Sequence, residues 1–99
     1  KKKEAEERNQ RYQNLKPLQV RLAKVESRLE VLMQTNETLQ SLLADTSIYE
    51  EDQKSRLLGA LEEQIVLKAE EKNLMQEWDN LTVAIEKIDS LAKSNFSEV

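Results

Sequence analysis

Apolar residues recur along the first half of the chain at alternating spacings of three and four residues. The positions are Leu15, Leu18, Leu22, Val25, Leu29, Leu32, Asn36, Leu39 and Leu43. This is the a and d pattern of a heptad, and a strand cannot present it because strand side chains alternate with a period of two. The pattern predicts a helix over about 18–44 with one narrow apolar seam.

A second heptad follows in the other half of the chain. Its positions are Leu67, Glu71, Leu74, Trp78, Leu81, Ile85, Ile88 and Ala92. Further upstream, we expect an apolar face of slightly shifted phase to continue through Leu57, Leu58, Leu61 and Ile65. The pattern predicts a second helix over about 52–92.

The two heptads are separated by a short segment rich in residues that favour turns. Asp45, Thr46 and Ser47 form side-chain-to-backbone hydrogen bonds more readily than they continue a helix, and Asp45 or Ser47 can cap the next turn. Acidic residues follow at 50–52, where they suit the start of a helix. We therefore expect a connection at 45–51, with Ile48 and Tyr49 folded back over the end of the seam.

Two seams of similar length joined by a short connection favour an all-α fold, a two-helix antiparallel coiled-coil hairpin that is monomeric. A turn centred near residue 48 predicts that facing residues have numbers summing to about 96, so that Leu18 faces the region of Trp78. Asn36 is expected to form a polar layer with Gln64 that fixes the register. The alternative is one unbroken helix that dimerises in parallel, and the turn residues argue against it.

Both ends of the chain are expected to differ from the 17–92 hairpin. Because proline disrupts a helix interior, Pro17 predicts a bend or break, with residues 1–16 as a basic N-terminal helical arm or linker. Ala5, Tyr12 and Leu15 would give this arm a weak seam. The segment 93–99 lacks periodicity and is expected to be disordered. The chain does not begin with methionine, which suggests a piece of a longer protein.

Composition supports a coiled coil and excludes several kinds of catalytic site. Ala, Glu, Lys, Leu and Arg make up 52 of the 99 residues, while glycine and proline occur once each. The chain has no cysteine and no histidine, and one glycine cannot form a phosphate-binding loop. We expect no enzymatic activity, no metal or cofactor, no membrane span and a cytoplasmic location.

Charge is distributed unevenly along the sequence. Residues 1–28 carry nine basic and four acidic residues, whereas residues 29–52 carry six acidic residues and no basic one. Helical spacing places Arg21, Lys24 and Arg28 on one flank. A basic flank on a helix suits the phosphate backbone of a nucleic acid, while a solvated face is the alternative. The candidate nucleic-acid-binding residues are Arg8, Arg11, Lys16, Arg21, Lys24 and Arg28.

Several sequence features together resemble the C-terminal extension of ABC-F ATPases of the YheS and Uup types. They are a basic arm leading to K-P-L at 16–18, a leucine heptad, an L-A-D…Y turn at 43–49, and Trp78 late in the second helix. The resemblance covers roughly residues 1–90. The family's turn often has proline after its aspartate, where this chain has Thr46.

The resemblance implies a two-helix coiled coil attached to two ATP-binding cassettes that act at the translating ribosome. ATP and Mg would belong to those cassettes of the same chain, and the partners of this module would be ribosomal RNA or DNA. The alternative function is a structural or protein-interaction coiled coil that braces the cassettes or mediates dimerisation. Trp78, an a-position residue, is expected to be a buried structural residue rather than a surface on which bases stack.

Overall fold

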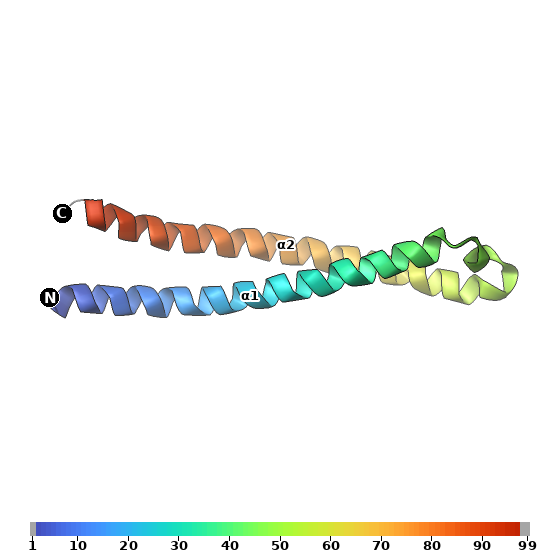
Figure 1. Ribbon diagram of the computed structural model, residues 1–99, viewed down its shortest axis with the longest axis horizontal. Helices are drawn as coiled ribbons and strands as arrows, with labels where there is room; N and C mark the ends of the chain where they lie inside the picture. The colour runs from blue at the N-terminus through green and yellow to red at the C-terminus, as the bar shows by residue number, and fades with distance from the viewer. Residues whose placement is uncertain (1, 98–99) are drawn as a thin grey trace. The chain divides into compact units, whose positions relative to one another are not determined.

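The structure is a computed structural model that describes residues 2–97, with side chains described for residues 2–91. It is an all-α, two-helix antiparallel hairpin, as the sequence predicts (Figure 1). Helix α1 spans Lys2–Ala44 and helix α2 spans Lys54–Ser97. Two short 3-10 helices, η1 at Thr46–Tyr49 and η2 at Glu51–Gln53, connect them. The described part of the chain contains no strand.

The hairpin consists of two compact units. Unit 1 combines the first part of α1 with the last part of α2, Lys1–Glu26 with Gln76–Val99. Unit 2 is Ser27–Met75 and includes the turn. The start of α1 and the end of α2 therefore both belong to unit 1 (Figure 1).

The heptad of α1 forms the expected seam in both units. In unit 1, Val25 is almost completely buried, and Leu15, Leu18 and Leu22 are half-buried. In unit 2, Leu32 and Leu39 are buried in a cluster with Ala60 and Leu67 of α2. Every a and d residue from Leu15 to Leu43 is buried or half-buried, which confirms the periodicity. Tyr12, expected in the seam of the arm, is instead exposed.

The prediction for the first turns of α2 is wrong in its phase. Leu58, Leu61 and Ile65 are exposed, and the seam instead runs through Leu57, Ala60, Gln64 and Leu67. These four positions continue the spacing of the downstream heptad without a shift. Two helices that supercoil around one another keep a single heptad seam facing the neighbour, so the long downstream seam sets the phase upstream, even where that brings a small and a polar residue inside.

The pairing of the helices differs from the predicted register by about two residues. The ion pairs Arg21–Glu77 and Arg28–Glu70 each have residue numbers that sum to 98. Asn36 and Gln64 are both half-buried on the seam, but the Asn36 amide donates to Glu71 Oε2 at 3.4 Å. Asn36 and Glu71 lie further apart along the helix axis than the members of the two ion pairs do. They still meet because each side chain tilts toward the N-terminus of its own helix, so side chains on antiparallel helices lean toward one another.

The turn is closed by its own side chains. The Asp45 carboxylate accepts hydrogen bonds from the Ser47 backbone N–H at 3.0 Å and from Ser47 Oγ at 2.9 Å. The bond from the Ser47 backbone is the main reason that the pKa of Asp45 is lowered. Ile48 is buried as expected, whereas the Tyr49 ring is exposed and its hydroxyl donates to Leu43 O at 2.8 Å. That bond satisfies one of the carbonyls left free at the end of α1.

The expectations for the two ends of the chain are corrected in part. Helix α1 runs through Pro17, so there is no break between an arm and the hairpin. Helix α2 continues to Ser97, so residues 93–97 are helical rather than disordered, and residues 98–99 lie outside the described residues. Helix formation at both ends gains from backbone hydrogen bonds of the preceding turns, which propagate an existing helix at low cost. Between residues 2 and 97, neither α-helix contains an apolar stretch of the length that a membrane span requires.

Candidate nucleic-acid interface

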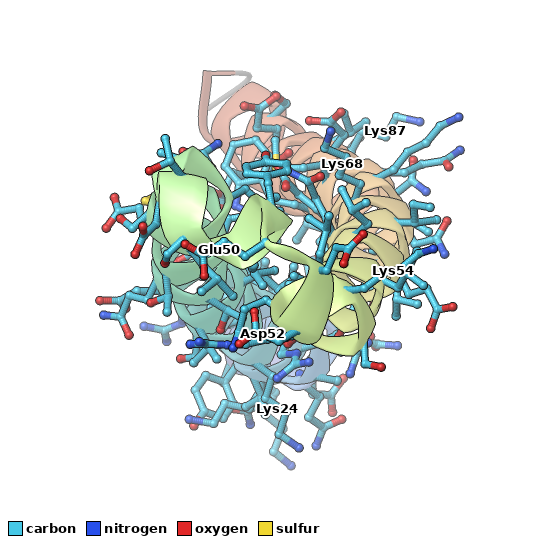
Figure 2. All side chains as sticks on the ribbon, turned by 90° about the vertical axis from the view of Figure 1, so that its right-hand side faces the viewer. Lys24, Glu50, Asp52, Lys54, Lys68 and Lys87 are labelled. Atoms are coloured by element: carbon cyan, nitrogen blue, oxygen red, sulfur yellow. The ribbon has the colours of Figure 1, made fainter. Side chains whose placement is uncertain are left out.

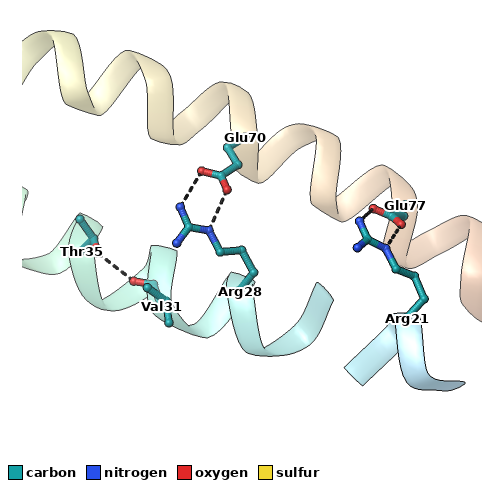
Figure 3. A network of polar contacts seen from close by, with 6 residues as sticks. All are labelled: Arg21, Arg28, Val31, Thr35, Glu70 and Glu77. Carbon is teal, nitrogen blue, oxygen red and sulfur yellow. Dashed lines mark hydrogen bonds and ion pairs between the residues drawn. The ribbon is translucent and has the colours of Figure 1, made fainter. Parts of the chain in front are cut away.

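Arg21, one of the predicted phosphate ligands, is joined to Glu77 of α2 within unit 1 (Figure 3). Its Nε donates to Glu77 Oε2, and its Nη2 donates to Glu77 Oε1 at 2.8 Å. This is a bidentate ion pair, in which the planar guanidinium matches the geometry of the carboxylate. The bonds from Arg21 lower the pKa of Glu77. The guanidinium edge that faces Glu77 is therefore already occupied.

Arg28 makes the same kind of contact within unit 2. Its Nε donates to Glu70 Oε1 at 2.7 Å and its Nη2 donates to Glu70 Oε2 at 3.0 Å (Figure 3). The hydrogen bonds from Arg28 lower the pKa of Glu70, and those to Glu70 raise the pKa of Arg28. About half of each arginine side chain remains accessible, 52% for Arg21 and 49% for Arg28. These arginines link the two helices, a role that the linear sequence does not indicate.

The other predicted ligands all lie on α1 in unit 1. Lys16, Lys24 and Arg8 are exposed, and Arg11 is half-buried. Within the described residues, none of these four forms an ion pair. Arg8, Lys16 and Lys24 follow one another at intervals of eight residues, so each is turned about 80° around the helix from the last. These three side chains therefore point in different directions around α1 and do not form a single basic stripe.

Folding changes the charge balance that the linear sequence suggests. Residues 1–26 and 76–99, which form unit 1, contain ten basic and nine acidic residues. Residues 27–75, which form unit 2, contain five basic and ten acidic residues. The acidic residues of α2 thus offset most of the basic excess of the first 28 residues. Unit 2 retains a strong negative charge, and unit 1 is close to neutral.

Trp78 lies in unit 1 and is half-buried in the seam. Its indole Nε1 donates to Glu26 Oε1 of α1 at 3.1 Å, which adds a polar bond to the apolar contact. A half-buried ring whose N–H is bonded to the other helix is held in place by the hairpin itself. Its position accords with the structural role that the heptad predicts, although the ring is less buried than expected.

In the part of the chain that the structure describes, the arrangement offers surface charge and ion pairs but no grouping suited to a metal. Within the described residues, no cluster of three or more Asp or Glu side chains could hold a metal ion. No buried side-chain nitrogen or oxygen of these residues lacks a hydrogen-bond partner. Comparisons with models of protein families, with curated proteins and with solved structures find no match for this chain.

Proposed function

We propose that the chain is a non-catalytic helical hairpin module of an ABC-F-type ATP-binding protein, located in the cytoplasm. Support comes from the residues that carry the resemblance, because several of them build the turn. Asp45 caps η1, and Tyr49 bonds the Leu43 carbonyl. Thr46 is the first residue of η1, a position at which proline is favoured, so either residue suits this geometry.

Within this proposal, unit 1 contacts the phosphate backbone of ribosomal RNA or DNA. The observation that carries the proposal is that Lys16 and Lys24 are exposed on α1 and form no ion pair within the described residues. A lysine ammonium that is free of a carboxylate partner can neutralise a phosphate and release its counterions. Arg21 and Arg28 then serve mainly to hold α1 against α2, which fixes where the lysines are presented.

Charge reversal at the two lysines tests this contact. Binding of the 99-residue chain to a structured RNA and to duplex DNA would be measured by fluorescence anisotropy at two salt concentrations. Lys16→Glu with Lys24→Glu is expected to weaken binding to all sequences alike. The logarithm of the affinity should fall with the logarithm of the salt concentration by about 0.7 to 0.9 per phosphate neutralised, and the variant should reduce that slope.

A charge-neutral exchange in the same unit provides the matched control. Arg21→Glu combined with Glu77→Arg keeps an ion pair and the net charge, so it is expected to leave binding nearly unchanged. If this exchange abolishes binding while the lysine variant does not, Arg21 rather than the free lysines contacts the phosphates. If neither variant changes a measurable affinity, the phosphate contact is contradicted.

A second candidate function is a structural or protein-interaction coiled coil that braces the cassettes or mediates dimerisation. It is favoured by the fact that two of the six candidate cations are engaged between the helices, where they stabilise the hairpin itself. The absence of salt-dependent binding to either nucleic acid would support this function over the first.

A further inference from the structure

Unit 2 exposes an apolar surface along one edge of its helix pair. We call it the outer face and define it by Met33 of α1 and by Leu58, Leu61 and Ile65 of α2. Their exposed fractions are 63%, 52%, 40% and 69%, respectively. The three residues of α2 follow the three-and-four spacing of a heptad, so they lie along one side of the helix. They are the residues that the sequence analysis expected inside the seam.

The ion pair in unit 2 shows which edge this surface occupies. Arg28 precedes the buried Leu32 by one turn of α1, whereas Met33 follows Leu32 and is rotated about 100° the other way. On α2, Glu70 and Leu61 lie on opposite sides of the buried seam for the same reason. Because Arg28 and Glu70 meet at one edge, Met33 and Leu61 belong to the other edge. One edge is thus closed by an ion pair, and the opposite edge is apolar and open.

Charged residues flank the outer face with opposite signs on its two helices. On α2, Lys54 and Lys68 continue the spacing of Leu58, Leu61 and Ile65 in both directions, and both side chains extend away from the helix (Figure 2). On α1, Glu30 and Glu37 lie on the corresponding side, and both are exposed. The face is therefore basic along α2 and acidic along α1.

This division of charge makes the face complementary to itself in only one orientation. A two-fold axis parallel to the helices places α1 of one copy on α2 of the other, which brings acidic residues against basic ones. The numbers of Glu30 and Lys68 sum to 98, as in the ion pair Arg28–Glu70, so these two residues lie at the same level along unit 2. A perpendicular axis would instead place α1 on α1, with glutamates facing glutamates and lysines facing lysines.

We propose that two copies of the chain associate through the outer face of unit 2 to form a four-helix bundle, with Lys68 of each copy facing Glu30 of the other. Burial of the exposed apolar side chains supplies the attraction, and the charged flanks select the orientation. The sequence predicts a monomer with Leu58, Leu61 and Ile65 in the seam within one chain, whereas the proposed association uses these exposed residues between two chains. It does not depend on nucleic-acid binding by unit 1.

Sedimentation equilibrium of the 99-residue chain tests the surface. The parent is expected to pass from monomer to dimer as its concentration rises, and Ile65→Glu is expected to remain monomeric. Val66→Glu is the matched control, because Val66 is similarly exposed at 64% but is rotated about 100° away from Ile65. Circular dichroism would establish that both variants keep the helical content of the parent. A parent that stays monomeric, or an Ile65→Glu variant that dimerises as Val66→Glu does, overturns the proposal.

A charge exchange tests the orientation. A symmetric dimer contains the contact between residues 68 and 30 twice. Lys68→Glu alone or Glu30→Lys alone puts like charges together at both contacts, so each variant should weaken self-association by at least about tenfold. Mixing the two variants restores opposite charges at both contacts, and the mixture is expected to form a heterodimer about as stable as the parent dimer. If the variants associate no better together than separately, this orientation is wrong. Labels at Thr46→Cys provide a second readout, because this orientation brings the two turns together whereas the perpendicular axis places them at opposite ends.

Discussion

Arg28 in α1 and Glu70 in α2 are 42 positions apart in the chain and meet in two hydrogen bonds of 2.7 and 3.0 Å. The contact ties one level of α1 to one level of α2, so it reports the register of unit 2. Both side chains are substantially exposed, at 49% and 35%, and water screens their attraction. The pair therefore mainly determines the register between α1 and α2 in unit 2, while the buried leucines supply most of the stability.

Reversing one member of this pair should lower the melting temperature, and reversing both should restore it. Arg28→Glu places two carboxylates together and is expected to destabilise the hairpin, whereas Arg28→Glu with Glu70→Arg re-forms an ion pair in the same place. Thermal unfolding followed by circular dichroism at low salt would measure the effect. Lys24→Glu, at an exposed position without an ion pair within the described residues, serves as the control. Equal loss in the single and double variants would contradict this role.

The hairpin should lose stability in acid because the pKa values of Glu70 and Glu77 are lowered by the bonds from Arg28 and Arg21. A carboxyl whose pKa is lower in the folded state stabilises that state above its unfolded pKa of about 4.3, and the contribution is lost as the pH falls through the lowered folded value. Asp45, whose pKa is also lowered, acts in the same direction at the turn. The melting temperature of the chain is therefore expected to decrease once the pH is lowered below about 4.5.

Removing the two glutamates tests the source of this acid sensitivity. Glu70→Gln with Glu77→Gln should melt at a lower temperature than the parent at neutral pH and should lose less on acidification. Melting curves from pH 7 down to pH 3 would compare the two chains. An equally large loss in the variant would show that other carboxyl groups cause the acid sensitivity.

Most of the fold is predictable because the long heptads favour two packed helices, and the turn residues indicate where the chain reverses. The sequence predicts the wrong phase for α2 between 57 and 65 because Leu58, Leu61 and Ile65 are more apolar than the seam residues Ala60 and Gln64. Local hydrophobicity favoured the wrong face. The unbroken extension of the downstream spacing through Leu57, Ala60 and Gln64 was the available signal.

The candidate interface was less predictable because a basic residue in a linear sequence does not reveal its partner on another helix. The sequence predicts that Arg21 and Arg28 contact phosphate, whereas in the structure each meets a glutamate more than 40 positions away. With a register sum of 98 in place of 96, both pairs would have been evident from the sequence. A shift of two residues moves a long side chain about 3 Å along the helix axis, which is enough to change its partner.

Trp78 should contribute to stability through both its ring and its N–H. Because the ring is only half-buried, Trp78→Ala is expected to lower the free energy of unfolding by about 2 kcal/mol, less than the 3–5 kcal/mol typical of a fully buried aromatic. Trp78→Phe keeps part of the packing but loses the bond to Glu26, so its loss should be smaller. Urea unfolding followed by circular dichroism would measure both variants. Unchanged stability together with lost nucleic-acid binding would instead assign the ring to base stacking.

Pro17 should weaken the helix that passes through it. Proline in a helix interior removes one backbone hydrogen bond and crowds the preceding turn, and α1 continues on both sides of it. Pro17 is exposed, so replacement by alanine removes little packing, and Pro17→Ala is expected to stabilise the chain by up to about 3 kcal/mol. Pro17→Gly should gain less, because glycine is a poorer helix former. A loss of stability in Pro17→Ala would indicate that the helix needs a proline-induced bend.

Replacing Gly59 of α2 with alanine should stabilise the folded chain. It is exposed within the helix, and a Cβ added there would have no neighbouring atom within 4 Å beyond its own helix backbone. Gly59→Ala is therefore expected to raise the free energy of unfolding by about 1 kcal/mol, because alanine loses less backbone entropy on forming a helix. Gly59→Val should gain less, since its branched side chain is restricted in a helix. Urea unfolding of the three chains would rank them, and a Gly59→Ala variant less stable than the parent would mean that this position is not regular helix.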